Sequence, residues 1–254
     1  MPAALADVLA EAERVLEPER FEDYGLNGLQ VPGGERVATL GSGVSAHAEL
    51  FERAALEQAE LLIVHHGMFW GSGVKAVDAP LKRRLEILFE ADIALAAYHL
   101  PLDAHPELGN NALLSRALGA TALQPFALHR GQTIGFIATL EPPGRSCEEL
   151  CASLVELTGR EPLAFAFGPP LIERLAVVSG AGADYLAEAS VAGAQALLTG
   201  EVPERAMAEA RETGMHLIAA GHYATETFGI RALGEHLARR FDLRHVFIDV
   251  PNPV

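Results

Sequence analysis

Three short apolar runs of the sequence each end in residue types that commonly bind metal ions. The residues concerned are His65 and His66 after the first run, His99 and Asp103 after the second, and His222 and Glu226 after the third. In the last two cases the acidic residue stands four positions after the histidine. A catalytic divalent metal needs three or more nitrogen or oxygen ligands and an open position, and imidazole and carboxylate groups supply such ligands.

Apolar runs of about four residues that end abruptly are typical of strands buried on both faces of a sheet. Helical spacing at residues 46–58 and 81–89 separates the first strands, which gives the β-α-β-α-β order of a parallel sheet with helices on its faces. The carboxyl ends of parallel strands share one edge of a sheet, and ligands bind at that edge. We therefore expect the three strand ends to form the walls of one metal site.

Five residues are assigned as ligands and a sixth as their support. The predicted ligands are His65, His66, Asp103, His222 and Glu226, and His99 is a candidate catalytic residue that supports them or serves as an occasional ligand. The adjacent histidines can face one site only if the strand has ended there, which Gly67 permits. His222 and Glu226 share one face of a helix if that helix begins after Gly221.

Three imidazoles and two carboxylates exceed the needs of one ion and indicate two divalent ions per chain, bridged by carboxylates. Such ligands suit zinc, iron, manganese and nickel. Paired ions activate water in many hydrolases, so a metal-dependent hydrolase is the leading hypothesis. The structural alternatives are a histidine pair that gives a buried strand a polar end, and an ordinary exposed helical pair at His222 and Glu226.

Two further motifs have weaker interpretations. Gly41-x-Gly43-x-x-Ala46 fits a loose dinucleotide-binding pattern, but the acidic residue that such a site needs is replaced by histidines, so we predict a tight turn into a helix. Phe69 and Trp70 follow the histidine pair and have the ring types that stack on heterocycles. A packed loop is the interpretation that we adopt for them.

Composition narrows the classes of partner. The chain of 254 residues has a net charge of −15, which argues against binding to a nucleic acid backbone. No apolar run reaches membrane-spanning length, and residues 1–12 lack the basic region of a signal peptide. The two cysteines, Cys147 and Cys151, have neither zinc-knuckle nor redox-motif spacing. We expect a cytoplasmic protein.

The strand pattern occurs twice. Residues 35–43, 59–64 and 94–103 have counterparts at 173–181, 194–199 and 217–226, and both third segments carry a histidine with an acidic residue four positions later. Residues 125–170 between the repeats are punctuated by Pro-Pro pairs and differ in character. The predicted fold class is therefore α/β, with two similar α/β halves of mostly parallel sheets at 1–124 and 171–254 and a small α+β insert at 125–170.

Several motifs of the chain resemble one known family. They are Asn27-Gly28-Leu29-Gln30-Val31, His65-His66-Gly67, His99-Leu100-Pro101-Leu102-Asp103, Thr199-Gly200-Glu201, Gly221-His222-x-x-x-Glu226 and Asp249-Val250-Pro251-Asn252-Pro253. From about residue 21 to the last residue, the chain resembles the Nif-three-like dinuclear metal proteins, also known as type two homologues of GTP cyclohydrolase I.

The resemblance implies two similar α/β parts and a toroidal homohexamer whose metal sites face an inner cavity. It implies the metal-ligand role for the same five residues. The cyclohydrolase label implies opening of the guanine ring of GTP at C8 with release of formate, so a nucleotide or another small molecule is an expected partner. The alternative is a non-catalytic metal-binding scaffold, a ring protein with a regulatory role.

Overall fold

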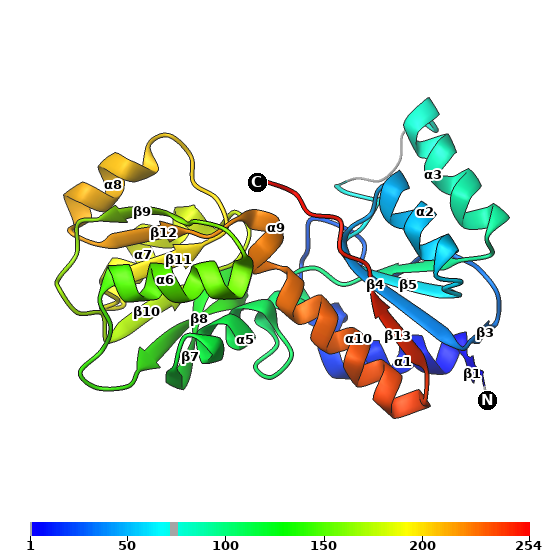
Figure 1. Cartoon of the computed structure of the whole chain (residues 1–254), viewed down its shortest axis with the longest axis horizontal. Helices are drawn as coiled ribbons and strands as arrows, with labels where there is room; N and C mark the ends of the chain where they lie inside the picture. The colour runs from blue at the N-terminus through cyan, green and yellow to red at the C-terminus, as the bar shows by residue number, and fades with distance from the viewer. Residues whose placement is uncertain (1, 72–75) are drawn as a thin grey trace. The chain divides into compact units, whose positions relative to one another are not determined.

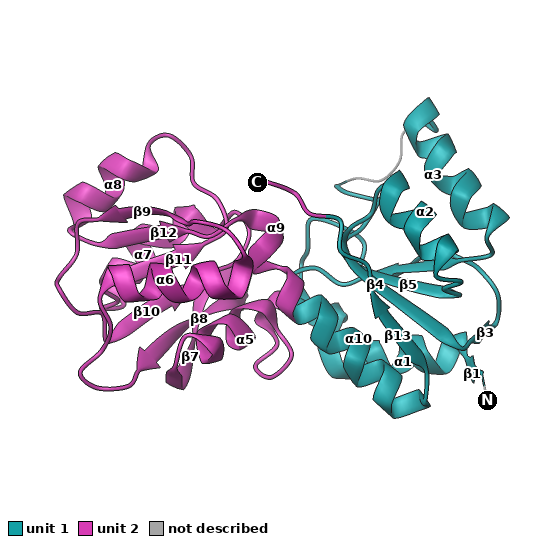
Figure 2. Ribbon diagram, in the orientation of Figure 1, with its two compact units in different colours: residues 1–102, 229–250 teal, residues 103–228, 251–254 magenta. Residues whose placement is uncertain are grey.

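A computed structural model describes residues 2–71 and 76–254, and the chain forms two compact units (Figures 1 and 2). Unit 1 comprises residues 1–102 and 229–250, and unit 2 comprises residues 103–228 and 251–254. Each unit is a sheet flanked by helices, which confirms the α/β class predicted from the sequence.

Unit 1 is built on a five-stranded sheet with the strand order β13-β4-β5-β6-β2. The first four strands are parallel, and β2 runs antiparallel to β6 at the edge. The elements are β1 (Ala3–Ala4), α1 (Leu5–Leu16), η1 (Pro18–Arg20), β2 (Gly28–Val31), β3 (Arg36–Val37), β4 (Thr39–Ser45), α2 (Ala48–Leu56), β5 (Leu61–His66), α3 (Ala79–Glu90), β6 (Ala94–Ala97), α4 (Leu100–Ala104), α10 (Thr227–Phe241) and β13 (Arg244–Phe247).

The two faces of this sheet are covered by different helices (Figure 1). On one face, α2 and α3 bury Leu50 and Leu88 against Leu62 and Leu95 of the central strands. Residues that alternate with these along each strand, such as Ile63, point to the opposite face and are equally buried. Full burial of both faces explains why β5 and β6 are apolar along their length rather than alternating.

The turn predicted at Gly41 and Gly43 is wrong, because both glycines lie inside β4. Their missing side chains make room for neighbours on the α2 face. A Cβ atom on Gly43 would lie 2.6 Å from Cδ1 of Leu50, and one on Gly41 would lie 3.1 Å from Cδ1 of Leu62. The glycines therefore allow close helix packing, and α2 begins at Ala48 rather than at Ala46.

Unit 2 is built on a six-stranded sheet with the order β7-β8-β10-β11-β12-β9. Strands β10, β11 and β12 are parallel, and the outer strands join antiparallel. The elements are α5 (Asn110–Ala117), β7 (Ala120–His129), β8 (Gln132–Leu140), α6 (Cys147–Thr158), β9 (Leu163–Ala166), β10 (Arg174–Val177), η2 (Gly182–Tyr185), α7 (Leu186–Val191), β11 (Ala196–Thr199), α8 (Ala206–Thr213), β12 (His216–Ala219) and α9 (His222–Thr225). Helices α5 and α6 pack on the sheet through Leu114, Leu150 and Leu154.

The predicted duplication is visible in the topology. Strands β4-β5-β6 correspond to β10-β11-β12, and in both units an antiparallel strand, β2 or β9, lies beside the third member. The likeness stops at the other edge of each sheet, where β13 joins β4 in parallel and β8 joins β10 antiparallel.

The compact units differ from the division expected at residues 124 and 170. The segment 125–170 forms no separate insert, because its strands β8 and β9 are hydrogen-bonded to β10 and β12 in the sheet of unit 2. The chain then returns to unit 1 through α10 and β13, since β13 pairs with β4. Among the described residues, no helix has the length and apolar character needed to cross a membrane.

The glycine at position 43 provides a test of the packing argument. Gly43→Ala should lower the free energy of unfolding by about 1–3 kcal/mol, because the added methyl group overlaps the Leu50 side chain, which is 1% exposed. In a Leu50→Ala background the same change should cost much less, since the overlapping atoms are gone. Urea unfolding of the four proteins measures this coupling. Equal costs in both backgrounds would contradict the proposed contact.

Candidate metal centre

Strand β5 of unit 1 ends in the paired histidines. His65 is fully buried and His66 is partly exposed, and their ring centroids lie 4.8 Å apart. The strand stops at His66 because the chain turns around the side chain of Gln30, whose Oε1 accepts a hydrogen bond of 2.7 Å from the Met68 amide. A Cβ atom on Gly67 would lie 2.2 Å from Nε2 of Gln30, so a larger residue would displace the Gln30 side chain from this position.

Protein atoms orient the rings of this pair. Nδ1 of His65 lies 3.0 Å from the carbonyl oxygen of Tyr98 and donates to it, because a carbonyl can only accept. Nδ1 of His66 lies 3.0 Å from the hydroxyl oxygen of Ser45, at the end of β4. Hydrogen bonds at one ring nitrogen, to a carbonyl or a similar group, are what hold metal-binding histidines in place. In His65 the other nitrogen, Nε2, then carries the lone pair.

His99 follows β6 and is held by the loop that precedes β2. Its Nδ1 lies 2.7 Å from Oδ1 of Asp23, and its backbone amide donates to Oδ1 of Asn27 at 2.8 Å. Asp23 also accepts from the Leu100 amide at 3.0 Å and from the Asn27 side chain at 2.9 Å. The loop therefore fixes both the position of the His99 backbone and the orientation of its ring.

The Asp23 carboxylate is buried, with 3% of its side chain exposed. Burial alone raises the pKa of a carboxyl group, but the hydrogen bond and charge of His99, with the bonds from Asn27 and Leu100, outweigh it and lower the pKa of Asp23 to about 2. The ionised carboxylate favours a proton on Nδ1 of His99, which leaves Nε2 as the nitrogen available to a metal.

The three histidines form one cluster within unit 1. His65, His66 and His99 each offer a ring nitrogen, and the three nitrogens lie within 4.8 Å of one another. The His65 and His99 ring centroids are 5.0 Å apart. Three imidazoles with hydrogen-bonded Nδ1 atoms are a donor set that fits a divalent metal ion such as zinc. The cluster therefore includes His99, the predicted supporting residue or occasional ligand, beside the predicted ligands His65 and His66.

In unit 2, Asp103 is buried and held by polar side chains. Its Oδ1 accepts hydrogen bonds from Asn110 Nδ2 at 2.8 Å and from the Ser179 hydroxyl at 3.1 Å. Asn111 supports the arrangement, because its Oδ1 accepts from the Ser179 amide at 2.7 Å. The start of α5 and the end of β10 therefore place this carboxylate, which is only 6% exposed.

The other predicted ligands of unit 2 are His222, which begins α9, and Glu226, which directly follows this helix, as the sequence predicts. Nε2 of His222 is 3.3 Å from Oε1 of Glu226, which is 2% exposed, and Nδ1 of His222 is 3.4 Å from Oε2 of Glu201. Gly180, with φ +60°, makes room for them, since a Cβ atom there would lie 2.3 Å from Oε1 of Glu226. Burial by itself lowers the pKa of His222, but hydrogen bonds and charges from both carboxylates outweigh it, so the pKa is raised.

The residues before α9 are held by the end of the chain. Gly221 has φ +98°, and a Cβ atom on it would lie 2.6 Å from Nη1 of Arg160. The same nitrogen donates to the Pro253 carbonyl at 2.7 Å, and the Tyr223 amide donates to the Val254 carbonyl at 3.1 Å. Arg160 and the final residues therefore pack together over the start of the helix that carries His222.

Sequence reasoning missed the residues that orient the predicted ligands. Asp23 and Asn27 lie 76 and 72 positions from His99, so no local pattern connects them with that histidine. Ser179 likewise approaches Asp103 from 76 positions away in the sequence, whereas Asn110 is only seven positions away. The Asn27-Gly28 pair was the only local signal, and it marks the start of β2.

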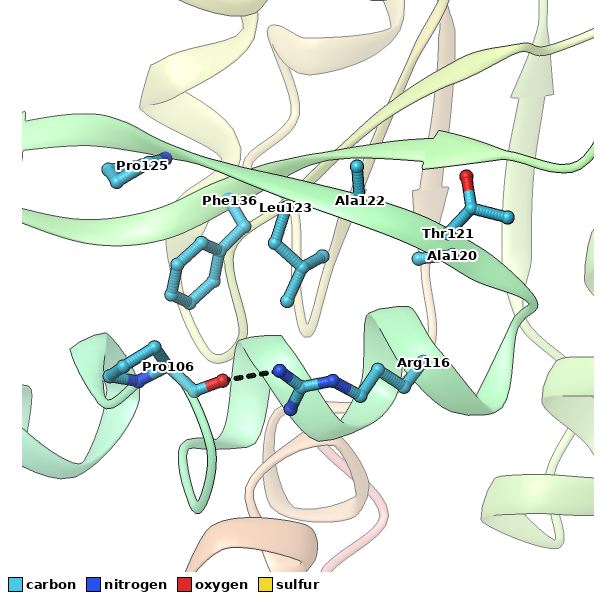
Figure 3. Close-up of a pocket in the computed structure, with 8 residues that line it drawn as sticks. All are labelled: Pro106, Arg116, Ala120, Thr121, Ala122, Leu123, Pro125 and Phe136. Atoms are coloured by element: carbon cyan, nitrogen blue, oxygen red, sulfur yellow. Dashed lines mark hydrogen bonds between the residues drawn. The ribbon is translucent and has the colours of Figure 1, made fainter.

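Unit 2 also contains a surface pocket of about 330 Å³, which Figure 3 shows between α5 and the strands β7 and β8. Apolar side chains such as Leu123 and Phe136 form much of its lining. Arg116 also lines the pocket, and its guanidinium group donates a hydrogen bond of 2.7 Å to the Pro106 carbonyl. None of the eight described lining residues is a predicted ligand, so this pocket is distinct from the carboxylates of the unit.

The fold and the imidazole cluster define a two-unit α/β protein with the residues to hold a metal ion. The family model for Duf34/NIF3 (NGG1p interacting factor 3) matches residues 3–253. The chain therefore belongs to this family, which confirms the resemblance drawn from its motifs.

Bacterial proteins are similar over all or most of the chain. A protein of Pseudomonas aeruginosa named GTP cyclohydrolase 1 type 2 homolog is 42% identical over 253 residues, with 100% of both chains covered. A protein of the same name from Escherichia coli is 41% identical over 244 residues, with 94% of both chains covered.

Solved structures with the same fold also match. The structure titled protein ybgI, of unknown function, has a TM-score of 0.92 and 38% identity, and the match covers 99% of this chain and 100% of that one. A protein from Thermus thermophilus has the same TM-score of 0.92 at 37% identity, with 99% and 100% covered.

The lowered pKa of Asp23 predicts how stability depends on pH. Because the folded-state value of about 2 lies below the ordinary value of 3.8, the stabilisation is present above pH 4 and is lost as the pH falls towards 2. Asp23→Asn should lower the unfolding free energy of the metal-free protein by about 2 kcal/mol at pH 5 and by little at pH 2. Urea titrations at both pH values measure this, with the exposed Glu19→Gln as control. A loss that is equal at both values would contradict the ionised contact.

Proposed function

We propose that this protein binds divalent metal ions, two per chain, and uses them for hydrolysis of a small molecule. The observation that carries the proposal is the cluster of His65, His66 and His99, whose three ring nitrogens lie within 4.8 Å of one another. The ring orientations are set by Tyr98, Ser45 and Asp23, so the cluster is pre-organised rather than formed by flexible surface side chains.

We further propose that the predicted ligands of both units act together. His65 and His66 supply imidazoles, and Asp103, His222 and Glu226 supply two carboxylates and a third imidazole. Support comes from the strand-end pattern of the sequence and from the burial of Asp103 and Glu226, which are 6% and 2% exposed. Buried carboxylates are costly unless a cation or several hydrogen bonds compensate them.

Bound divalent ions would polarise the substrate and lower the pKa of a water molecule. The residues of the chain then have separate tasks. Asp23 holds His99 in one orientation, and Asn110 and Ser179 hold the Asp103 carboxylate. The carboxylates of Glu226 and Glu201 raise the pKa of His222 and so favour its protonated form. A metal ion that binds this imidazole must compete with that proton.

The name shared by the curated relatives, GTP cyclohydrolase 1 type 2 homolog, suggests the reaction class. Opening of the guanine ring at C8 breaks two carbon–nitrogen bonds, consumes two water molecules and releases formate. We propose GTP as the first substrate to test. The competing function is a metal-binding scaffold without turnover, and the experiments below separate the two.

Metal content tests the ligand assignment directly. The purified protein should hold close to two divalent ions per chain, and His65→Ala and Glu226→Ala should each lose most of this metal, because each removes a proposed ligand. His236→Ala is the matched control, since this histidine pairs with Glu11 and belongs to no proposed ligand set. Elemental analysis after reconstitution at neutral pH gives the counts. An unaltered metal content in both ligand variants would refute the assignment.

Turnover and its pH dependence test the hydrolase proposal. The rate of formate release from GTP by the metal-loaded protein should increase between about pH 5.5 and about pH 7.5. Imidazoles must be neutral to bind metal, and free histidine titrates at about 6.5. The same profile should be absent in His65→Ala. If metal binds at two ions per chain but neither formate nor another product forms, the scaffold function is favoured instead.

A further inference from the structure

Trp70 is the only tryptophan of the chain and lies against the imidazole cluster of unit 1. Its ring centroid is 5.1 Å from that of His99, with the ring planes at 84°, and 5.8 Å from that of His66. Yet 42% of this side chain is exposed. The packed loop predicted from the sequence describes Phe69, which packs against the core, but it does not describe Trp70.

Backbone contacts hold the indole in this exposed position. Its Nε1 donates to the Gly67 carbonyl at 2.8 Å, and residue 70 forms an antiparallel bridge with Gly25. The bridge is extended on both sides, by a hydrogen bond from the Leu26 amide to the Phe69 carbonyl and one from the Gly71 amide to the Tyr24 carbonyl, at 3.3 and 2.7 Å. The ring is therefore fixed by local hydrogen bonds and not by burial.

Gly25 brings the backbone directly against the indole ring. A Cβ atom at this position would lie 3.2 Å from Cε3 and 3.4 Å from Cζ3 of Trp70. One part of the ring is thus covered by the backbone of the 24–26 segment, while another part remains open to solvent. An aromatic ring that is held rigidly without being buried gains little for stability, and such rings are typical of binding surfaces.

Tyr24 places a second aromatic ring next to the same histidine. Its centroid is 6.2 Å from that of His99, and 49% of the residue is exposed. Because the residues on either side of the Gly25–Trp70 bridge are tied together, Tyr24 and Trp70 belong to one small ladder of backbone hydrogen bonds. Both rings therefore flank the imidazole cluster from a common, well-defined support.

We infer that Trp70 and Tyr24 form a stacking site for the planar ring of a nitrogen heterocycle of purine type. This inference rests on the proposed function and specifies which residues would bind the heterocycle of its substrate. Aromatic side chains bind heterocyclic bases through their flat faces, and each stacked base contributes about 1–3 kcal/mol, irrespective of its hydrogen-bonding pattern. Because the Trp70 centroid lies 5.8 Å from that of His66 and 5.1 Å from that of His99, a ring stacked on the indole would lie near the imidazole cluster proposed to bind metal.

The alternative occupant is a second copy of the chain. Leu26 and Leu29 are also exposed, at 55% and 40%, and they neighbour Tyr24 in the sequence. A protein interface would use all of these apolar groups, whereas stacking of a small ring depends on the aromatic residues. A heterocycle is favoured because both exposed rings contact the imidazole cluster, while an interface needs no such relation to the histidines.

The single tryptophan makes the test direct. Guanosine added to metal-loaded protein should quench the fluorescence excited at 295 nm in a saturable manner, whereas ribose 5-phosphate should not. Trp70→Leu should raise the Kd for guanosine, measured by calorimetry, about 10-fold, and Trp70→Phe should recover part of the affinity because it keeps a flat ring. Phe89→Leu is the control, an exposed aromatic residue on α3 of the same unit, and it should leave the Kd unchanged.

Three outcomes would overturn the inference: no saturable quenching by guanosine, an unchanged Kd in Trp70→Leu, or fluorescence that follows protein concentration rather than guanosine. The last would assign the face to contact between copies. These results are distinguishable from failure of the proposed function. If the protein binds guanosine through Trp70 but shows neither metal nor turnover, the stacking site is supported and the hydrolase proposal fails. If it holds two metal ions per chain but does not bind guanosine, the metal site is supported and the stacking site fails.

Discussion

The hydrogen bond between the Asp23 carboxylate and Nδ1 of His99 is the contact on which the candidate site of unit 1 depends. It orients one imidazole of the cluster, and the loop that supplies it also pairs with the backbone beyond the other two histidines. Residues 24–26 pair with residues 69–71, which begin three positions after His66 and include Trp70. One loop of about five residues therefore sets the ring of His99, the backbone after His66 and the exposed indole together. A change in this loop would disturb all three at once.

Buried carboxylates recur in both units and follow the same physical rule. The side chain of Asp23 is 3% exposed, and the residues Asp103 and Glu226 are 6% and 2% exposed, in a chain of net charge −15. Each is compensated locally: Asp23 by His99 and three amide donors, Asp103 by Asn110 and Ser179, and Glu226 by His222. A desolvated carboxylate favours any cation that can reach it, whether a proton on an imidazole or a metal ion. The same groups that stabilise the metal-free fold therefore prepare it for a metal.

The sequence predicted what local pattern controls. The apolar strands β5, β6 and β12 and the helix start at His222 follow from runs of apolar residues and from Gly221. Two features escaped because they depend on contacts between distant positions. Gly41 and Gly43 look like a turn, but they are strand residues that make room for neighbours such as Leu50, and Asp23 looks like a loop residue although it fixes His99. The segment 125–170, expected as an insert, contributes β8 and β9 to the sheet of unit 2, and hydrogen bonds between strands leave no mark on local composition.

The two units show how one topology carries different chemistry. Both place three parallel strands and an antiparallel neighbour in the same order, and both follow the third strand with a histidine and an acidic residue four positions later. The surroundings differ, however. His99 has one buried carboxylate at Nδ1, which fixes a single tautomer, whereas His222 lies between two carboxylates that favour its protonated form. The first environment suits a histidine that presents a lone pair, and the second suits one that exchanges a proton for a cation. The repeated spacing thus supplies positions, and the residues contributed by distant loops decide what each position does.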